Sequence, residues 1–126
     1  MYTKLKYLSD LKFNIETWRR ELQFHFNEMD TFQEKLEEIV KHEQDPLALV
    51  KLEVFQNRIM IEKDAISKLK HRCRNKLANL NNLEVNENVT GKFQNEQHTL
   101  KEDMRTYIKL HYELKEEMMN YFIEVL

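Results

Sequence analysis

Hydrophobic residues recur at alternating steps of three and four along almost the whole chain. The first run is Leu8, Leu11, Ile15, Trp18, Leu22, His25, Met29, Phe32, Leu36 and Ile39. The second is Leu52, Phe55, Ile59, Glu62, Ile66, Leu69, Cys73, Lys76, Leu80 and Leu83. The third is Phe93, Gln97, Leu100, Met104, Tyr107, His111, Leu114, Met118, Tyr121 and Val125. Such spacing keeps one stripe on one face of a helix and is typical of helices packed as in coiled coils.

Two short segments separate the three runs. Asp45 followed by Pro46 fits a helix N-cap and the first helical position, which predicts a turn near 43–45. An Asn-rich stretch predicts a second turn near 84–89, after which Asn88 or Thr90 would cap the next helix. We therefore predict three helices, over about 8–42, 46–83 and 90–125.

Composition agrees with an all-α fold. The 126 residues include one Gly and one Pro, so little interrupts regular structure. The length suits one domain, spanning 1–126. Because short turns make neighbouring helices antiparallel, we expect an up-down-up bundle of three long helices with coiled-coil-like packing.

Polar residues interrupt the stripes, and three of them fall in one layer. Folding the predicted helices at their turns brings His25 level with Glu62, and Glu62 level with His111. A slip of half a heptad, about 5 Å along the axis, would place them in adjacent layers instead. The sequence therefore predicts that these three side chains lie close together inside the bundle.

Such a layer has two main interpretations. In the first, the Glu62 carboxylate accepts hydrogen bonds from one or both imidazoles, and the buried polar cluster fixes the register of the helices. In the second, His25, Glu62 and His111 bind zinc or iron, with Glu21 and Glu28 completing or orienting the ligands. The spacing does not require a metal, and no Glu-x-x-His pair of the ferritin-like kind occurs. A small-ligand site in the same cavity is a third option.

A second set of apolar residues lies outside the stripes. It comprises Leu47, Val54 and Ile61, then Tyr112, Met119 and Leu126, with Ile108, Phe122 and Ile123 beside them and Phe24, Phe26 and Val40 on the first helix. All fall towards the end of the bundle next to the first turn, and a monomeric three-helix bundle cannot bury them all. We expect a homodimer, or binding of another protein, through this end.

The charge and the absence of catalytic motifs argue against nucleic-acid binding, membrane binding and enzymatic activity. The net charge is −2 with both signs mixed, which does not indicate nucleic-acid or membrane binding. No apolar run approaches about 18 residues, so we expect a soluble, cytoplasmic protein. Cys73 lies in an apolar stripe with no adjacent base, and no Gly-rich loop or Ser, His and Asp set occurs. We therefore expect a non-enzymatic protein.

One resemblance rests on Trp18, on "FHFNE" at 24–28 and on "FQN" at 55–57. With these residues the first two predicted helices resemble uncharacterised bacterial helical-bundle proteins of about this length. The family pattern has another aromatic at the position of His25 and an amide at that of Glu62. This sequence therefore differs from the family at two of the positions that would have to bind a metal. The resemblance implies a helical fold and no particular chemistry.

Overall fold

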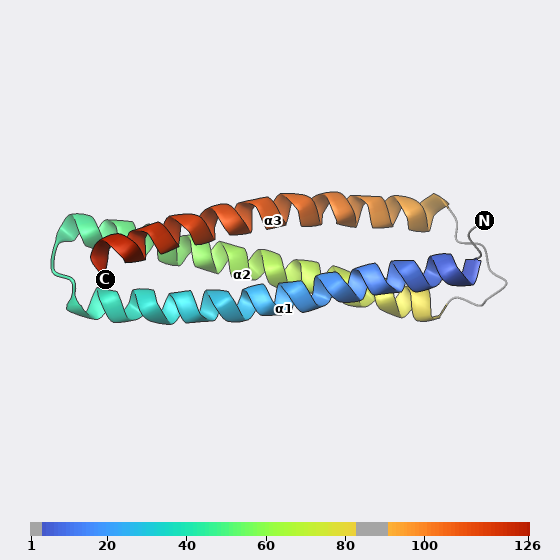
Figure 1. Ribbon diagram of the computed structural model, residues 1–126, viewed down its shortest axis with the longest axis horizontal. Coiled ribbons are helices and arrows are strands. Elements are labelled where there is room, and N and C mark those ends of the chain that lie inside the picture. Colours follow the sequence, from blue (N-terminus) through green and yellow to red (C-terminus); the bar gives the residue numbers. More distant parts are fainter. Residues whose placement is uncertain (1–3, 83–90) are drawn as a thin grey trace.

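The computed structural model describes residues 4–82 and 91–126, with side chains placed for 8–82 and 98–126. It forms a bundle of three helices, α1 (Lys4–His42), α2 (Pro46–Asn81) and α3 (Gly91–Val125), which lie along the long axis of the molecule (Figure 1). The all-helical prediction is confirmed. Helix α1 begins earlier than predicted and α2 ends two residues sooner, whereas the predicted turn at 84–89 lies outside the described residues.

The first turn has the predicted cap. The backbone N–H of Leu47 donates to Oδ1 of Asp45 at 3.2 Å, and Pro46 occupies the first helical position, where no N–H is needed. Lys41 and His42 stand in the last turn of α1, where positive charge complements the exposed carbonyl groups. This cap and the short connection fix where α2 starts, and thereby the level at which its side chains meet α1.

The described parts of the three predicted stripes form most of the core, whereas Leu83, Phe93 and Gln97 lie outside the residues whose side chains are described. Its buried apolar residues include Ile15, Leu22, Met29, Leu36, Leu52, Ile59, Ile66, Leu80, Met104 and Met118. Trp18, Phe32 and Ile39 are only partly buried against this core. Val125, predicted to face inwards, is 46% exposed in the last turn of α3, whereas Leu77 is buried although it lies outside the predicted stripe.

The helices do not pack equally closely. The backbones of α1 and α2 run near each other over more of their length than those of α2 and α3. Ion pairs cross both junctions: Lys63 of α2 binds Asp30 of α1, and Arg58 of α2 binds Glu117 of α3. In the described parts of the chain, none of the helices is apolar over a length sufficient to cross a membrane.

Candidate functional site

The polar layer, consisting of His25, Glu62 and His111, lies in the core with one residue on each helix. The three side chains are 2%, 8% and 0% exposed, respectively. Among the described side chains, Lys76 is the one other buried charged or polar residue. Burying ionisable groups is costly unless they are paired, so the contacts around this layer decide what it contributes.

The two imidazole rings of the layer stack on each other. The ring centroids of His25 and His111 are 3.8 Å apart, and the planes differ by 8°. Tyr112 meets both rings edge-on, at centroid distances of 5.7 Å and 5.4 Å. Two aligned rings at this separation disfavour a charge on both, because like charges repel strongly away from water.

Two carboxylates approach His111 from different sides. Its Nδ1 is 3.2 Å from Oε1 of Glu62, and its Nε2 is 3.5 Å from Oε1 of Glu28. A neutral imidazole has one N–H and can donate to one of them, whereas a protonated ring can donate to both. The other oxygen of Glu28 accepts a hydrogen bond from Nζ of Lys115 at 2.6 Å. The layer therefore extends into an alternating series of acidic and basic groups between α1 and α3.

His25 is held by a tyrosine instead. Its Nδ1 is 2.6 Å from the hydroxyl oxygen of Tyr107. Burial, and secondly the charge of Glu62, raise the pKa of Tyr107 above its usual 10, so the phenol keeps its proton and donates it to Nδ1. Neutral His25 then carries its own proton on Nε2, which lies 3.5 Å from Oε2 of Glu21 one turn earlier on α1.

Burial acts on the protonation of His25. Removal from water lowers its pKa below 6.5, and the neighbouring His111 lowers it further, while Glu21 and Glu28 act in the opposite direction. Within the described residues, Nε2 of His25, Nε2 of His111 and Oε1 of Glu28 are buried without hydrogen-bonded partners. Buried polar atoms without hydrogen-bond partners lower the free energy of unfolding. Protonation of these atoms, or a side-chain movement that gives them partners, should therefore change the stability of the protein.

The arrangement gives no support to the metal interpretation of His25, Glu62 and His111. In residues 4–82 and 91–126, no group of three or more His, Cys, Asp and Glu side chains is placed to hold a metal ion. The physical reason is the stack: parallel rings direct their edge nitrogens side by side, not towards one point. In addition, each Nδ1 already faces Tyr107 or Glu62.

The residues predicted for an interface are mostly exposed. Leu47, Val54 and Ile61 on α2 are 80%, 51% and 69% exposed, and the α3 residues Tyr112, Met119, Ile123 and Leu126 are also exposed. Phe122 differs from the prediction, because its ring packs against Phe32 at 5.8 Å and is partly buried by the core. On α1, Phe24 is exposed, whereas Phe26 and Val40 pack against the core, as does Ile108 of α3.

Two contributors to the polar layer were not identified from the sequence. Lys115 lies off the predicted apolar stripe, yet it binds Glu28 of the neighbouring helix. Tyr112 was assigned to the external surface, although its ring also contacts both imidazoles. The sequence does indicate a role for Lys115. It follows His111 by about one helical turn, just as Glu28 follows His25 by about one turn, so both charged residues lie next to the polar layer.

Comparison of the chain with protein-family models, with curated proteins and with solved structures yields no match.

Proposed function

We propose that the protein acts without catalysis, by self-association through apolar residues exposed at the end of the bundle next to the first turn, in the cytoplasm. This proposal includes an antiparallel up-down-up topology with coiled-coil-like packing, which agrees with the contacts of Lys63 with Asp30 and of Arg58 with Glu117. The alternative is that the same surface binds a different protein, and the experiment described below distinguishes this from self-association.

The observation that carries the proposal is the spacing of the exposed residues on α2. We call Leu47, Val50, Val54 and Ile61 the α2 stripe; all four are at least half exposed. With Asn57 in the gap, they follow the same alternating steps of three and four as the buried core. Helix α2 thus carries a second, short coiled-coil seam that α1 and α3 do not cover.

Charges beside this seam suit a second copy of the chain. Lys51 and Arg58 follow one edge of the α2 stripe, and Glu53 stands on the other edge. If two α2 helices associate in parallel, Glu53 of each copy approaches Arg58 of the other, whereas the antiparallel arrangement brings like charges together. The geometry therefore favours a two-fold dimer with parallel α2 helices.

Helix α3 offers a separate surface. Tyr112, Met119, Ile123 and Leu126, the α3 stripe, are also exposed, and Figure 1 places the C-terminus at the same end of the molecule as the first turn. Tyr112 and Met119 stand one turn before and after Lys115, which binds α1. Val54 and Ile61 stand one turn before and after Arg58, which binds α3. The two stripes consequently border different inter-helix junctions and can be tested separately.

Sedimentation equilibrium of the full chain tests the proposal. We expect a dimer at micromolar concentration, weakened at least about tenfold in a Val54→Glu, Ile61→Glu double variant, since two charges would be placed in an apolar contact. Phe13→Glu is the control, because Phe13 is also an exposed apolar side chain but lies outside both stripes. Met119→Glu reports the contribution of the α3 stripe.

Several outcomes would contradict self-association. A wild-type chain that sediments as a monomer at high micromolar concentration would rule it out, and a pull-down from the native host that depends on Ile61 would then assign the surface to another protein. Equal weakening by Phe13→Glu would show that any added charge is sufficient. Circular dichroism of each variant establishes that the helices are retained.

A further inference from the structure

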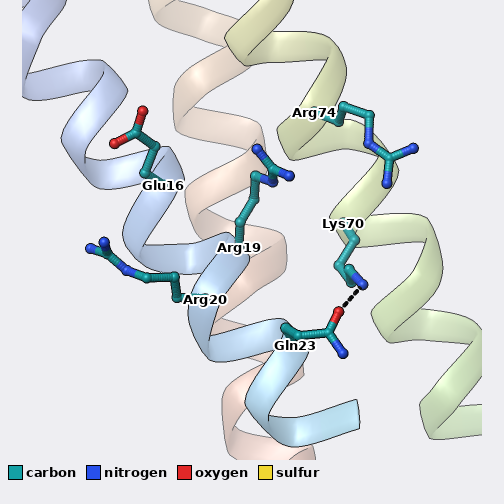
Figure 2. Close-up of a pocket in the computed structure, with 6 residues that line it drawn as sticks. All are labelled: Glu16, Arg19, Arg20, Gln23, Lys70 and Arg74. Carbon is teal, nitrogen blue, oxygen red and sulfur yellow. Dashed lines mark hydrogen bonds between the residues drawn. The ribbon is translucent and has the colours of Figure 1, made fainter. Parts of the chain in front are cut away.

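A groove between α1 and α2 is lined mainly by basic side chains. Its volume is about 530 Å³, and we call it the basic groove (Figure 2). Its lining residues are Glu16, Arg19, Arg20, Gln23, Lys70 and Arg74. Four positive groups and one carboxylate thus share one surface of a protein whose net charge is −2. Local field depends on such nearby groups far more than on the net charge.

The helical repeat shows what the groove lacks. One heptad away, Lys63 of α2 binds the carboxylate of Asp30 on α1. Seven residues further along α2 and seven residues back along α1, the equivalent pair is Lys70 with Gln23, so a neutral amide occupies the position that corresponds to the Asp30 carboxylate. Figure 2 shows the Lys70 ammonium beside this amide, between the two helices. The positive charge of Lys70 is therefore hydrogen-bonded but not neutralised.

The arginines of the groove are also not neutralised. In the described part of the chain, Arg19 and Arg74 make neither a side-chain hydrogen bond nor an ion pair, and Arg20 contacts the hydroxyl of Thr17 at 3.5 Å. By contrast, Arg58 and Arg72 each pair with a carboxylate of α3. Unneutralised positive groups from two helices repel one another, and an anion bound between them removes that repulsion.

We propose that the basic groove binds an anion carrying two or more phosphate groups. Guanidinium groups present planar sets of N–H donors that match phosphate oxygens, and Lys70 adds a mobile ammonium. Figure 2 shows Arg19 extending from α1 towards α2, whereas Arg20 extends from α1 away from α2 and the Arg74 guanidinium lies on the side of α2 that faces away from α1. Arg19 and Lys70 accordingly form the centre of the site, and Arg20 and Arg74 lie at its two margins.

The lining also limits the class of ligand. None of the six lining residues is aromatic, and the Phe26 ring, 5.9 Å from the Lys70 ammonium, packs against the core, so the lining offers no aromatic side chain on which a nucleobase can stack. Recognition therefore rests on the phosphate groups, and tripolyphosphate should bind as tightly as a nucleoside triphosphate. The site is independent of the proposed dimer contact, because the α2 stripe ends at Ile61, before Lys70.

Isothermal titration of the full chain with tripolyphosphate at about 50 mM salt tests the proposal, with orthophosphate, sulfate, ATP and phosphoinositide-containing vesicles as comparison ligands. We expect saturable binding of tripolyphosphate that weakens as salt is raised. The variant Arg19→Gln, Arg74→Gln should bind at least about tenfold more weakly. Its control is Lys101→Gln, Lys109→Gln, which removes the same charge from exposed positions on α3 and should change binding less than about twofold.

A second readout does not depend on titration heats. Tripolyphosphate should raise the thermal unfolding midpoint of the wild-type chain and of the α3 control, but not that of the groove variant. Binding of the free anion or of phosphoinositide vesicles that is lost in the groove variant supports the site and identifies the source of the phosphates. Absence of both, equal loss in the control variant, or tighter binding of single-stranded RNA through the same arginines would overturn it.

Discussion

His25 of α1 and His111 of α3 stack face to face inside the bundle, with ring centroids 3.8 Å apart. The pair brings together two helices whose backbones approach each other little, so large side chains carry the contact. Because burial lowers the pKa of His25, the packing of α3 on α1 is linked to the protonation of this residue. This relationship leads to the first prediction.

Stability should fall when the pH is lowered from about 7 to 5.5. Burial and His111 lower the pKa of folded His25 below 6.5, the value it regains on unfolding. The unfolded chain therefore binds a proton in this window before the folded chain does, and acid favours unfolding. Urea denaturation across the window should show a fall in free energy of unfolding that is smaller in His25→Phe. His71→Phe, at an exposed histidine, is the control and should retain the wild-type pH dependence.

Removing one hydroxyl should destabilise the layer. Tyr107→Phe deletes the hydrogen bond to Nδ1 of His25 and leaves that nitrogen buried without a donor. The expected cost is about 1–3 kcal/mol in the free energy of unfolding, measured by urea denaturation at pH 7.5. Tyr121→Phe removes the same atom from a buried tyrosine that has no hydrogen bond among the described residues, and should cost much less. Equal losses would show that the bond to His25 adds nothing.

Glu28 and Lys115 should be energetically coupled. Both side chains are about three-quarters or more removed from solvent, and Lys115 donates to Glu28 at 2.6 Å while Glu28 also faces His111. A double-mutant cycle with Glu28→Gln and Lys115→Met should give a coupling energy of about 1 kcal/mol. The exposed pair of Lys68 with Asp64 on α2 is the comparison, for which little coupling is expected. Additive effects at Glu28 and Lys115 would show that the two side chains do not stabilise each other.

Cys73 should react with thiol reagents only when the bundle opens. The residue is fully buried, and burial raises the pKa of its thiol to about 11, so at neutral pH it is protonated and shielded. Alkylation followed by mass spectrometry should show slow labelling in buffer and fast labelling in denaturant. Rapid labelling of the folded chain would mean that the core around Cys73 opens far more readily than its packing indicates.

The sequence pattern was sufficient for the helices and for the location of the polar layer. Alternating steps of three and four identify which residues face inwards, and the Asp45–Pro46 dipeptide fixes the first turn. Together these predict that His25 and Glu62 lie at one level. The level of His111 rests in addition on the predicted second turn, which lies outside the described residues, and His111 does contact both His25 and Glu62. Periodicity specifies the direction in which a residue leaves its helix, and this direction is largely retained in the folded chain.

Periodicity does not specify side-chain torsions or partners on neighbouring helices. The imidazole stack and the hydrogen-bond partners of each ring depend on side-chain rotamers, which local packing selects. With the rotamers found here, the carboxylate of Glu62 contacts His111, and the hydroxyl of Tyr107 contacts His25. The basic groove combines two separate sequence segments, and in each segment alone its charges resemble ordinary surface residues. Val125 is exposed although it follows the pattern, because it is the last residue of α3 and no further helical turn covers it.

The connection between α1 and α2 consists of three residues, whereas the contact of His25 with Tyr107 joins residues 82 positions apart. Forming the helical hairpin closes a short loop, while docking α3 on α1 closes a long one and loses more chain entropy. Folding should therefore begin beside Asp45 and reach the imidazole stack late. The layer that joins all three helices then forms last, after the rest of the chain has folded.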